Sequence, residues 1–423
     1  MSNSDVQSGS IGYIKAWALA AGGMVGGGIY VSLGVVIEAA GQYAWLSFLI
    51  AGIAAVLSAY SYAALTNKYA KSGGVFDFLE EINHKNMGGI ISWLLALGYT
   101  LTISVYAYAF GNYLSYAFGM GDIATKVFVI CILTSMAMLN LAGASKLTAV
   151  EVAIVSANLI ILLVLGIAGL LDWQPEQLSA GIETRTINAS LFGAAAIFVA
   201  YEGFQLLTYE YEDLKSPKKW FTTVLTSAAC FVVLCYIIVT LGATMIAGAH
   251  GIVAHDGVSL SFAAQQKFGF IGLVCMSLAA AFATSAAINS TLFSTAKLMK
   301  RIAREHELPQ WFNQTNKNDI PSNAIILIAF VAGSFAMLGS LSNLVEAASL
   351  VFITVFIIVN SLCYIKLGHV MRYMGLAGAV LSFAIMGFLI VRLWNNTPMS
   401  LLMIISAVIA ITMAHIYFRK SKK

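Results

Sequence analysis

A glutamate in the middle of an apolar run is the residue best placed to do chemistry in this chain. It is Glu202, and it lies in residues 198–205, which read FVAYEGFQ. An acidic side chain at the centre of a run long enough to cross a bilayer costs about 3 kcal/mol to insert, so it normally has a partner or a task. We expect Glu202 either to bind a cationic group or to take up and release a proton in a polar cavity. The alternative is a hydrogen-bonded glutamate that only fastens helices together.

The second candidate is a cluster of backbone groups rather than a side chain. Residues 22–28 read GGMVGGG, which places five glycines in seven positions. Each glycine costs about 1 kcal/mol relative to alanine in a helix, so the cluster predicts a broken turn. Free N–H groups at the start of the following half-helix, together with its positive dipole end, suit a carboxylate. The alternative is close packing of two helices at small residues.

The composition places both features in a membrane. Of 423 residues, 60% are hydrophobic and only 10% are charged. The apolar residues form runs of roughly 20, the length of a membrane-spanning helix, without the alternation of a barrel strand. The net charge of +4 is no signal for nucleic-acid binding, because the basic residues lie between the runs. The polar start of the chain lacks the pattern of a cleaved signal peptide, so the first run is expected to stay in the protein.

Hydropathy predicts about twelve spans in a single integral-membrane domain covering residues 1–423. They are residues 16–39, 44–66, 90–117, 125–143, 149–171, 189–211, 221–247, 268–296, 323–339, 344–366, 374–394 and 399–418. With the N-terminus inside, 19 of the 23 Lys and Arg residues fall on the inner side, a strong bias of the kind that sets orientation. Both termini are therefore expected to face the cytoplasm, in the cell membrane.

The two candidate features lie five spans apart. This spacing predicts two five-span halves of inverted topology, residues 11–171 and 189–366, each opening with a discontinuous helix. The last two spans, residues 374–418, fall outside the repeat. A substrate site is then expected near the midplane, between the two breaks.

Six short motifs, in this order within twelve spans, give the chain a family resemblance. They are residues 22–30, 69–76, 139–143, 198–204, 212–217 and 304–309. Together they resemble the amino acid–polyamine–organocation transporter superfamily from about residue 11 to about residue 325. The resemblance implies an all-α, five-plus-five inverted-repeat fold of the LeuT type, and transport by alternating access rather than enzymatic activity.

The resemblance also implies roles for particular residues. The carboxylate of an amino-acid substrate would meet the N–H groups of Gly26, Gly27 and Gly28. Its amine would meet carbonyls of Met24 and Val25 in the first break, and of Val199, Ala200, Tyr201 and Glu202 beside Gly203 in the second. Side-chain specificity would come from candidates that include Tyr106, Tyr108, Phe198, Tyr201 and Phe204.

The coupling ion is where the chain departs from the pattern. Many relatives carry a lysine in helix 5 in place of a bound sodium ion, whereas this chain has Asn158. The hydroxyls of Thr284 and Ser285 offer a sodium site at the matching level, although such residues also serve helix packing. We expect proton-coupled symport through Glu202, with sodium coupling, amino-acid exchange, or polyamine and organic-cation transport as alternatives.

Other functions are disfavoured by what the sequence lacks. It has no P-loop signature, no nucleophile–base pattern, and no cluster of histidine, cysteine and acid at metal spacing. We therefore expect no cofactor and no bound metal apart from that sodium alternative. A solute sensor would usually append a signalling domain, and a channel would need a continuous polar path through the membrane.

Overall fold

The computed structural model describes residues 11–143 and 148–420. Within these ranges the chain folds into α-helices and short 3-10 helices, and Ile11 and Leu214 form an isolated β-bridge. The predicted all-α class is confirmed.

Every expected span coincides with a long helix or with a broken pair of helices. The α-helices are α1 Tyr13–Val25, α2 Gly28–Ala40, α3 Ala44–Tyr69, α4 Val75–Glu80, α5 Lys85–Ala117, α6 Asp122–Leu141, α7 Thr148–Leu170, α8 Ala189–Ala196, α9 Phe221–Ala254, α10 Ser259–Arg304, α11 Ser322–Leu338, α12 Leu341–Lys366, α13 His369–Asn396 and α14 Pro398–Lys420. The 3-10 helices are η1 Gly41–Tyr43, η2 Pro175–Leu178, η3 Phe198–Tyr201, η4 Phe204–Asp213, η5 Pro217–Lys219 and η6 Gln310–Asn313.

Length and hydropathy support the span count. Eight described helical stretches are long and apolar enough to cross a membrane, and the bent pair of α8 with η3 and η4 makes up to nine. The first stretch, Tyr13–Tyr69, has 57 residues, which as one helix would be far longer than a membrane is thick. It therefore contains two of the expected spans. Two shorter apolar helices, Ser322–Leu338 and Ile404–Met413, supply the rest.

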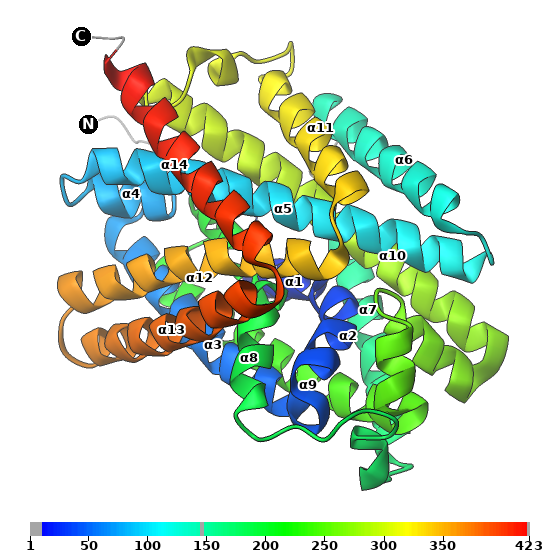
Figure 1. Ribbon diagram of the computed structural model, residues 1–423. Coiled ribbons are helices and arrows are strands. Elements are labelled where there is room, and N and C mark those ends of the chain that lie inside the picture. Colours follow the sequence, from blue (N-terminus) through cyan, green and yellow to red (C-terminus); the bar gives the residue numbers. More distant parts are fainter. Residues whose placement is uncertain (1–10, 144–147, 421–423) are drawn as a thin grey trace.

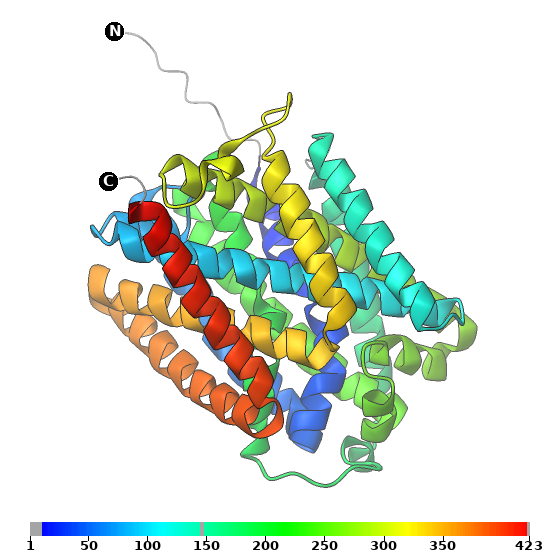
Figure 2. The same ribbon diagram turned by 45° about the horizontal axis from the view of Figure 1, so that its top comes forward.

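The helices surround the two broken pairs. In Figure 1, α5 runs across the molecule behind α14, with α6 and α11 above its right half and α12 and α13 below its left half. The pair α1 and α2 lies behind α5 and α12, near α8 and α9. The start of α1 and the end of α14 lie at the same end of the molecule in both views (Figures 1 and 2), as an even number of spans requires.

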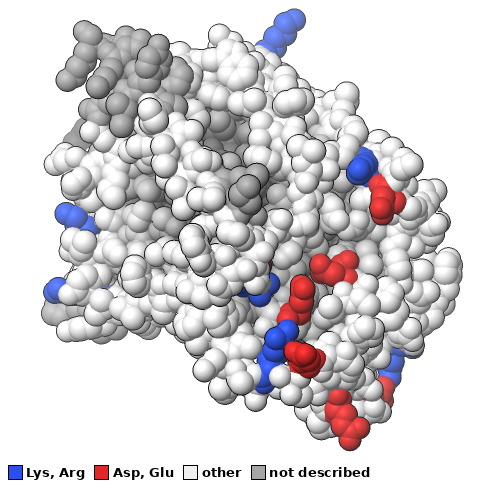
Figure 3. All heavy atoms as spheres, in the orientation of Figure 1, with Lys and Arg blue, Asp and Glu red and all other residues white. Residues whose placement is uncertain are grey.

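The surface agrees with a membrane setting. On the face seen in Figure 3 most atoms belong to uncharged residues, and the charged side chains are a few at the edges and one group in the lower right part of the face. Large apolar side chains are exposed on several helices, including Ile130 on α6, Phe330 on α11 and Phe383 on α13. A soluble protein would rarely expose so much apolar surface, whereas a bilayer covers it.

The connection between the seventh and eighth spans differs from the expected loop, because it is helical. The helix α9 continues past a kink at Gly248, where φ is +67°, and α10 begins ten residues before a kink at Gly269, where φ is +64°. Left-handed φ values of this kind suit glycine and turn the chain sharply without ending either helix. Residues 248–268 thus form a bent outer arm.

A buried carboxylate holds the loop after α3 at the end of the molecule that carries the termini. Asp77 on α4 accepts a hydrogen bond from the backbone N–H of Gly73 at 2.7 Å and from Nη2 of Arg301 on α10 at 2.9 Å. Burial raises the pKa of Asp77, while the Arg301 guanidinium and the Gly73 N–H oppose that rise. The contact ties the motif at residues 69–76 to the last turn of α10.

Candidate substrate site

The first break is where the glycine cluster predicts it. The helix α1 ends at Val25, α2 begins at Gly28, and the two residues between them lie in a turn. The N–H of Gly26 still completes α1 by donating to the carbonyl of Gly22 at 2.8 Å. Gly27 has φ −150° and ψ −18°, outside the helical region. The N–H groups released by the break therefore begin at Gly27 and continue into the first turn of α2.

Close approach of other elements explains why two of these positions are glycine. A Cβ at Gly27 would lie 2.1 Å from the ring of Tyr106 on α5. A Cβ at Gly28 would lie 2.3 Å from the carbonyl oxygen of Ala200 and 2.4 Å from the hydroxyl of Tyr236. Any side chain here would push the neighbouring helices away from the break.

The second break contains the predicted glutamate, Glu202. The α-helix α8 ends at Ala196, η3 makes one 3-10 turn, and the chain then becomes extended at Glu202. Gly203 has φ +126°, which a residue with a side chain rarely adopts, and the pair of helices bends by 57°. Glu202 thus lies in extended backbone between η3 and η4, and its side chain is buried.

The two breaks are in direct contact. A Cβ at Gly203 would lie 2.3 Å from the backbone carbon of Gly23, and one at Gly23 would lie 2.8 Å from the carbonyl oxygen of Gly203. Glycine on both sides lets the two backbones touch. The two breaks therefore lie together, while the inverted repeat and the substrate site between them stay predictions.

Glu202 is buried and bonded to neutral groups. Only 1% of its surface is exposed. Its Oε1 accepts a hydrogen bond from Nε2 of Gln205 at 3.0 Å, and its Oε2 accepts one from the Tyr106 hydroxyl at 3.4 Å. Gln205 is itself oriented by the N–H of Gly203, which donates to its Oε1 at 3.0 Å. Among the ion pairs of the described residues, none includes Glu202.

A tyrosine that sequence reasoning missed joins the two breaks. The hydroxyl of Tyr236 on α9 lies 2.8 Å from the carbonyl oxygen of Met24 and 3.0 Å from that of Ala200, and it donates to them. These are two of the carbonyls that the family resemblance assigns to the substrate amine. Tyr236 is fully buried in an apolar helix, where a tyrosine carries no sequence signal that separates it from packing.

A serine on α12 supports the second break in a similar way. The N–H of Val199 donates to the hydroxyl of Ser349 at 3.0 Å, and that hydroxyl donates to the carbonyl of Ala196 at 3.0 Å. Ser349 thus satisfies backbone groups that the change from α8 to η3 leaves without helical partners. Sequence reasoning missed this residue as well, because nothing near it in the sequence distinguishes it from other small residues.

Of the two α5 aromatic candidates, Tyr106 belongs to the site. It is buried against Gly27 and donates to Glu202, so it contacts both breaks. Tyr108 is half-buried and packs against the hydrophobic core. Side chains two residues apart on a helix point to different faces, so Tyr106 faces the breaks and Tyr108 does not.

The three aromatic candidates around the second break pack against other helices. The hydroxyl of Tyr201 donates to the carbonyl of Phe48 on α3 at 2.7 Å. The rings of Phe198 and Phe204 both lie beside Phe356 on α12, with centroids 5.5 and 5.4 Å away. These contacts fix the shape of the break.

Asn158 on α7 faces the second half of the first broken helix. It is buried, and its Oδ1 accepts a hydrogen bond from the hydroxyl of Tyr30 on α2. A neutral amide that accepts from a tyrosine differs from the fixed positive charge of a lysine at this place.

The hydroxyls of Thr284 and Ser285 are directed along their own helix. Each donates to a carbonyl of the preceding turn of α10, at 2.7 and 2.6 Å. A hydroxyl that donates in this way keeps lone pairs for a cation. Their part in coupling stays a prediction.

These features define a class: a multi-pass helical membrane protein with a buried site between two interrupted helices. A family model described as amino acid permease matches residues 11–418. The chain therefore belongs to the amino acid permease family, whose members are transporters rather than enzymes.

Individual relatives cover much of the chain at low identity. The inner membrane transport protein YbaT of Escherichia coli is 27% identical over an alignment of 440 positions, which covers 100% of both chains. The serine/threonine exchanger SteT of Bacillus subtilis is 25% identical over 71% of this chain and 69% of its own. Cationic amino acid transporter 3, mitochondrial, of Arabidopsis thaliana is 24% identical over 80% of this chain and 59% of its own.

Proposed function

We propose that this permease is a secondary active transporter that moves an amino acid across the cell membrane by alternating access, with a proton as the coupling ion. The observation that carries the proposal is Glu202, a buried carboxyl at the contact between the two broken helices, with neutral hydrogen-bond partners.

The first break supports an amino-acid substrate through its carboxylate. The N–H of Gly26 is used within α1, so the substrate carboxylate would meet N–H groups from Gly27 into the first turn of α2. The positive end of the α2 dipole adds to the attraction. The glycines keep this turn free of side chains, so its N–H groups are not screened from a small anionic group.

The carbonyls on the other side of the site support binding of the substrate amine. Met24 and Ala200 present carbonyl oxygens toward one point, where the Tyr236 hydroxyl now donates to them. An ammonium group carries three donors and would replace that single hydroxyl. Binding would then release Tyr236 from the junction of the two breaks, which gives alternating access a local trigger.

A proton is the coupling ion that the site suits best. An ionised carboxylate away from water costs several kcal/mol unless a positive charge compensates it. Glu202 has no ionic partner among the described residues, so a proton or a cationic substrate would supply the balance. Taking the proton from one side and releasing it to the other would tie substrate movement to the proton gradient.

A cationic substrate is the second candidate. Here the unpaired carboxyl of Glu202 would receive the positive charge of a basic amino acid or a polyamine instead of a proton. Several relatives carry the name cationic amino acid transporter, which fits this reading.

The orientation is part of the proposal. Placing 19 of the 23 Lys and Arg residues on the inner side puts both termini in the cytoplasm.

Uptake into proteoliposomes tests the function directly. The purified chain would be given labelled small neutral, large neutral and cationic amino acids and polyamines, with a proton gradient, a sodium gradient or neither. Accumulation of an amino acid driven by the proton gradient is the expected result. Uptake driven only by sodium, or only by preloaded amino acid, would replace the coupling model, and uptake of polyamines alone would favour the second candidate.

A further inference from the structure

A polar pocket lies outside the substrate site, at the end of the molecule opposite the termini. It has a volume of about 470 Å³ and lies between the end of α7, the segment leading to η2, the outer part of α9 and the start of α10. This is the size range of small-molecule sites. Its lining residues are Leu171, Asp172, Trp173, Gln174, Gln177, Met245, Ile246, Gln266 and Lys267.

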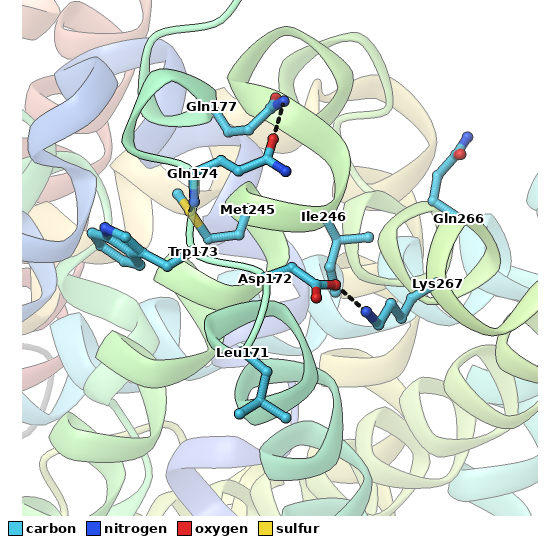
Figure 4. A pocket seen from close by; sticks show the side chains of 9 residues that line it. All are labelled: Leu171, Asp172, Trp173, Gln174, Gln177, Met245, Ile246, Gln266 and Lys267. Carbon is cyan, nitrogen blue, oxygen red and sulfur yellow. Dashed lines mark hydrogen bonds and ion pairs between the residues drawn. The ribbon is translucent and has the colours of Figure 1, made fainter.

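The pocket carries one charge of each sign at its rim. The ammonium of Lys267 pairs with Oδ2 of Asp172, and Figure 4 shows this pair at the side where α10 begins. Both side chains keep contact with water, since 30% of Lys267 and 55% of Asp172 is exposed. An exposed pair of this kind is worth little to the fold, so a ligand can exchange it for its own charges at low cost.

Carboxamide groups occupy the opposite side of the pocket. In Figure 4, Gln174 and Gln177 lie side by side, where Nε2 of Gln177 donates to Oε1 of Gln174 at 3.4 Å. The backbone N–H of Gln174 donates to the sulfur of Met245, which fixes the segment against α9. Carboxamide groups so placed give the pocket polar donors and acceptors on the side away from Lys267.

Two apolar stripes lead away from the pocket toward the middle of the protein. Exposed residues on α7 include Ile160, Val164 and Ile167, followed by Leu171 directly after the helix, and on α10 they include Ile271, Cys275, Leu278 and Phe282. Both sets repeat at intervals of four, three and four residues, which places each on one face of its helix. Leu171 belongs to a stripe and also lines the pocket, so the polar and apolar surfaces are continuous.

The neighbouring residues are those of a membrane interface. Trp173 is 49% exposed beside the pocket, and Lys267 extends from the kink of α10 at Gly269. Tryptophan is enriched where headgroups meet hydrocarbon, and lysine places its ammonium there. A soluble ligand would use the charges alone, whereas a lipid would use the charges together with the two stripes.

We propose that this pocket binds the headgroup of phosphatidylethanolamine from the outer leaflet, with its phosphate on Lys267, its ammonium on Asp172 and its acyl chains along the α7 and α10 stripes. The headgroup carries one anion and one primary ammonium, so it matches both members of the ion pair. A choline headgroup offers no N–H to the carboxylate of Asp172, and a glycerol headgroup offers no cation. The proposal is independent of the transported substrate.

Photolabelling of the full-length protein tests this assignment. The protein would be reconstituted in phosphatidylcholine vesicles containing a phosphatidylethanolamine with a photoreactive group at the start of one acyl chain. Labelled peptides should come from the outer ends of α7 and α10, and unlabelled phosphatidylethanolamine should compete. The Lys267→Gln variant should lose about tenfold of this labelling, as expected for loss of a charged hydrogen bond.

Controls separate the lipid from other sources of the same chemistry. Asp172→Asn should weaken labelling by phosphatidylethanolamine but not by a matched phosphatidylglycerol probe, which has no ammonium. Lys126→Gln and Asp122→Asn, exposed on α6 at the same end of the molecule, should leave the labelling unchanged. Size-exclusion elution and melting temperature would show that each variant is folded.

Three results would overturn the proposal. One is labelling of Lys267→Gln at the parent level, and another is labelled peptides that lie away from α7 and α10. The third is competition by soluble phosphoethanolamine as strong as that by the intact lipid, which would mean that the acyl chains add nothing and that the pocket takes a water-soluble zwitterion.

Discussion

At the scale of single residues, two side chains control the site by different means. Glu202 brings a carboxyl into a region without an ionic partner, and Tyr236 holds the carbonyls of Met24 and Ala200 together. The first would carry a charge through the transport cycle, and the second would report whether the substrate amine is bound. Each role predicts a different result when only one polar group is changed.

Replacing Glu202 with glutamine should remove proton coupling and keep the fold. Glutamine retains an oxygen that accepts from Gln205 or Tyr106, but it cannot exchange a proton. Accumulation driven by a proton gradient should fall by about tenfold or more, because a positioned acid or base contributes at least that factor to the rate of proton transfer. Exchange of substrate should continue. The exposed Glu38→Gln is the matched control and should retain coupling. A Glu202→Gln protein that accumulates substrate normally would remove the residue from the mechanism.

Replacing Tyr236 with phenylalanine should lower the melting temperature of the substrate-free protein. It should also enlarge the rise in melting temperature that substrate causes. Each buried carbonyl left without a donor costs about 1–3 kcal/mol, and a bound amine would restore that loss. The melting temperature measured with and without substrate reports both effects. Tyr201→Phe removes a hydroxyl that bonds to Phe48 instead, so it should lower stability without enlarging the substrate shift. Equal substrate shifts in both variants would contradict the role of Tyr236.

At the scale of elements, the two broken helices organise the protein, and both breaks were predictable from the sequence. Five glycines in seven residues weaken α1 locally, and Glu202 followed by Gly203 marks the second break. The contact of Gly23 with Gly203 is consistent with the inverted arrangement, because the breaks are five spans apart. The domain limits of the two halves remain a prediction.

Other features at this scale could not be read from local pattern. The supporting hydroxyls of Tyr236 and Ser349 come from distant helices, so their role depends on tertiary packing. The 3-10 form of η4 and the helical outer arm at residues 248–268 were also missed. In the arm the hydropathy is as low as in a loop, so the sequence predicts a loop there. The chain stays helical, and the kinks at Gly248 and Gly269 turn the arm away from the direction of the two spans.

Gly27 in the first break should not tolerate even a small side chain. A Cβ at Gly27 would meet the Tyr106 ring at 2.1 Å, so Gly27→Ala should displace Tyr106 and weaken substrate binding by about tenfold or more. Gly27→Val should abolish binding, because it also fills the space meant for the carboxylate. Binding would be measured by equilibrium titration of the purified protein. Gly387→Ala on α13, where an added Cβ meets nothing within 4 Å, is the control, and unchanged affinity of Gly27→Val would refute the carboxylate site.

At the scale of the whole molecule, charge and hydropathy define how the protein lies in the membrane. The described surface is apolar around the helices, and the start of α1 and the end of α14 lie at one end (Figures 1 and 2). The distribution of basic residues predicts that this end faces the cytoplasm. The proposed mechanism works in either orientation, because the proton gradient sets the direction of net transport in a reversible alternating-access cycle.

Labelling of single cysteines should confirm the orientation. In a parent whose five cysteines are replaced, Lys126→Cys on α6 should react with a membrane-impermeant maleimide in intact cells. Lys218→Cys in η5 should react only after the cells are permeabilised. Both positions are exposed, so access to the reagent reports sidedness rather than burial. The reverse pattern would place the termini outside.

The internal pH of proteoliposomes tests the central claim most directly. The purified protein would be reconstituted with a pH-sensitive dye inside, without sodium and with the membrane potential clamped, and amino acids would be added outside. Proton-coupled symport predicts that a transported amino acid acidifies the interior, and that Glu202→Gln abolishes this signal. Uptake of labelled amino acid by the parent protein without any acidification would contradict the account.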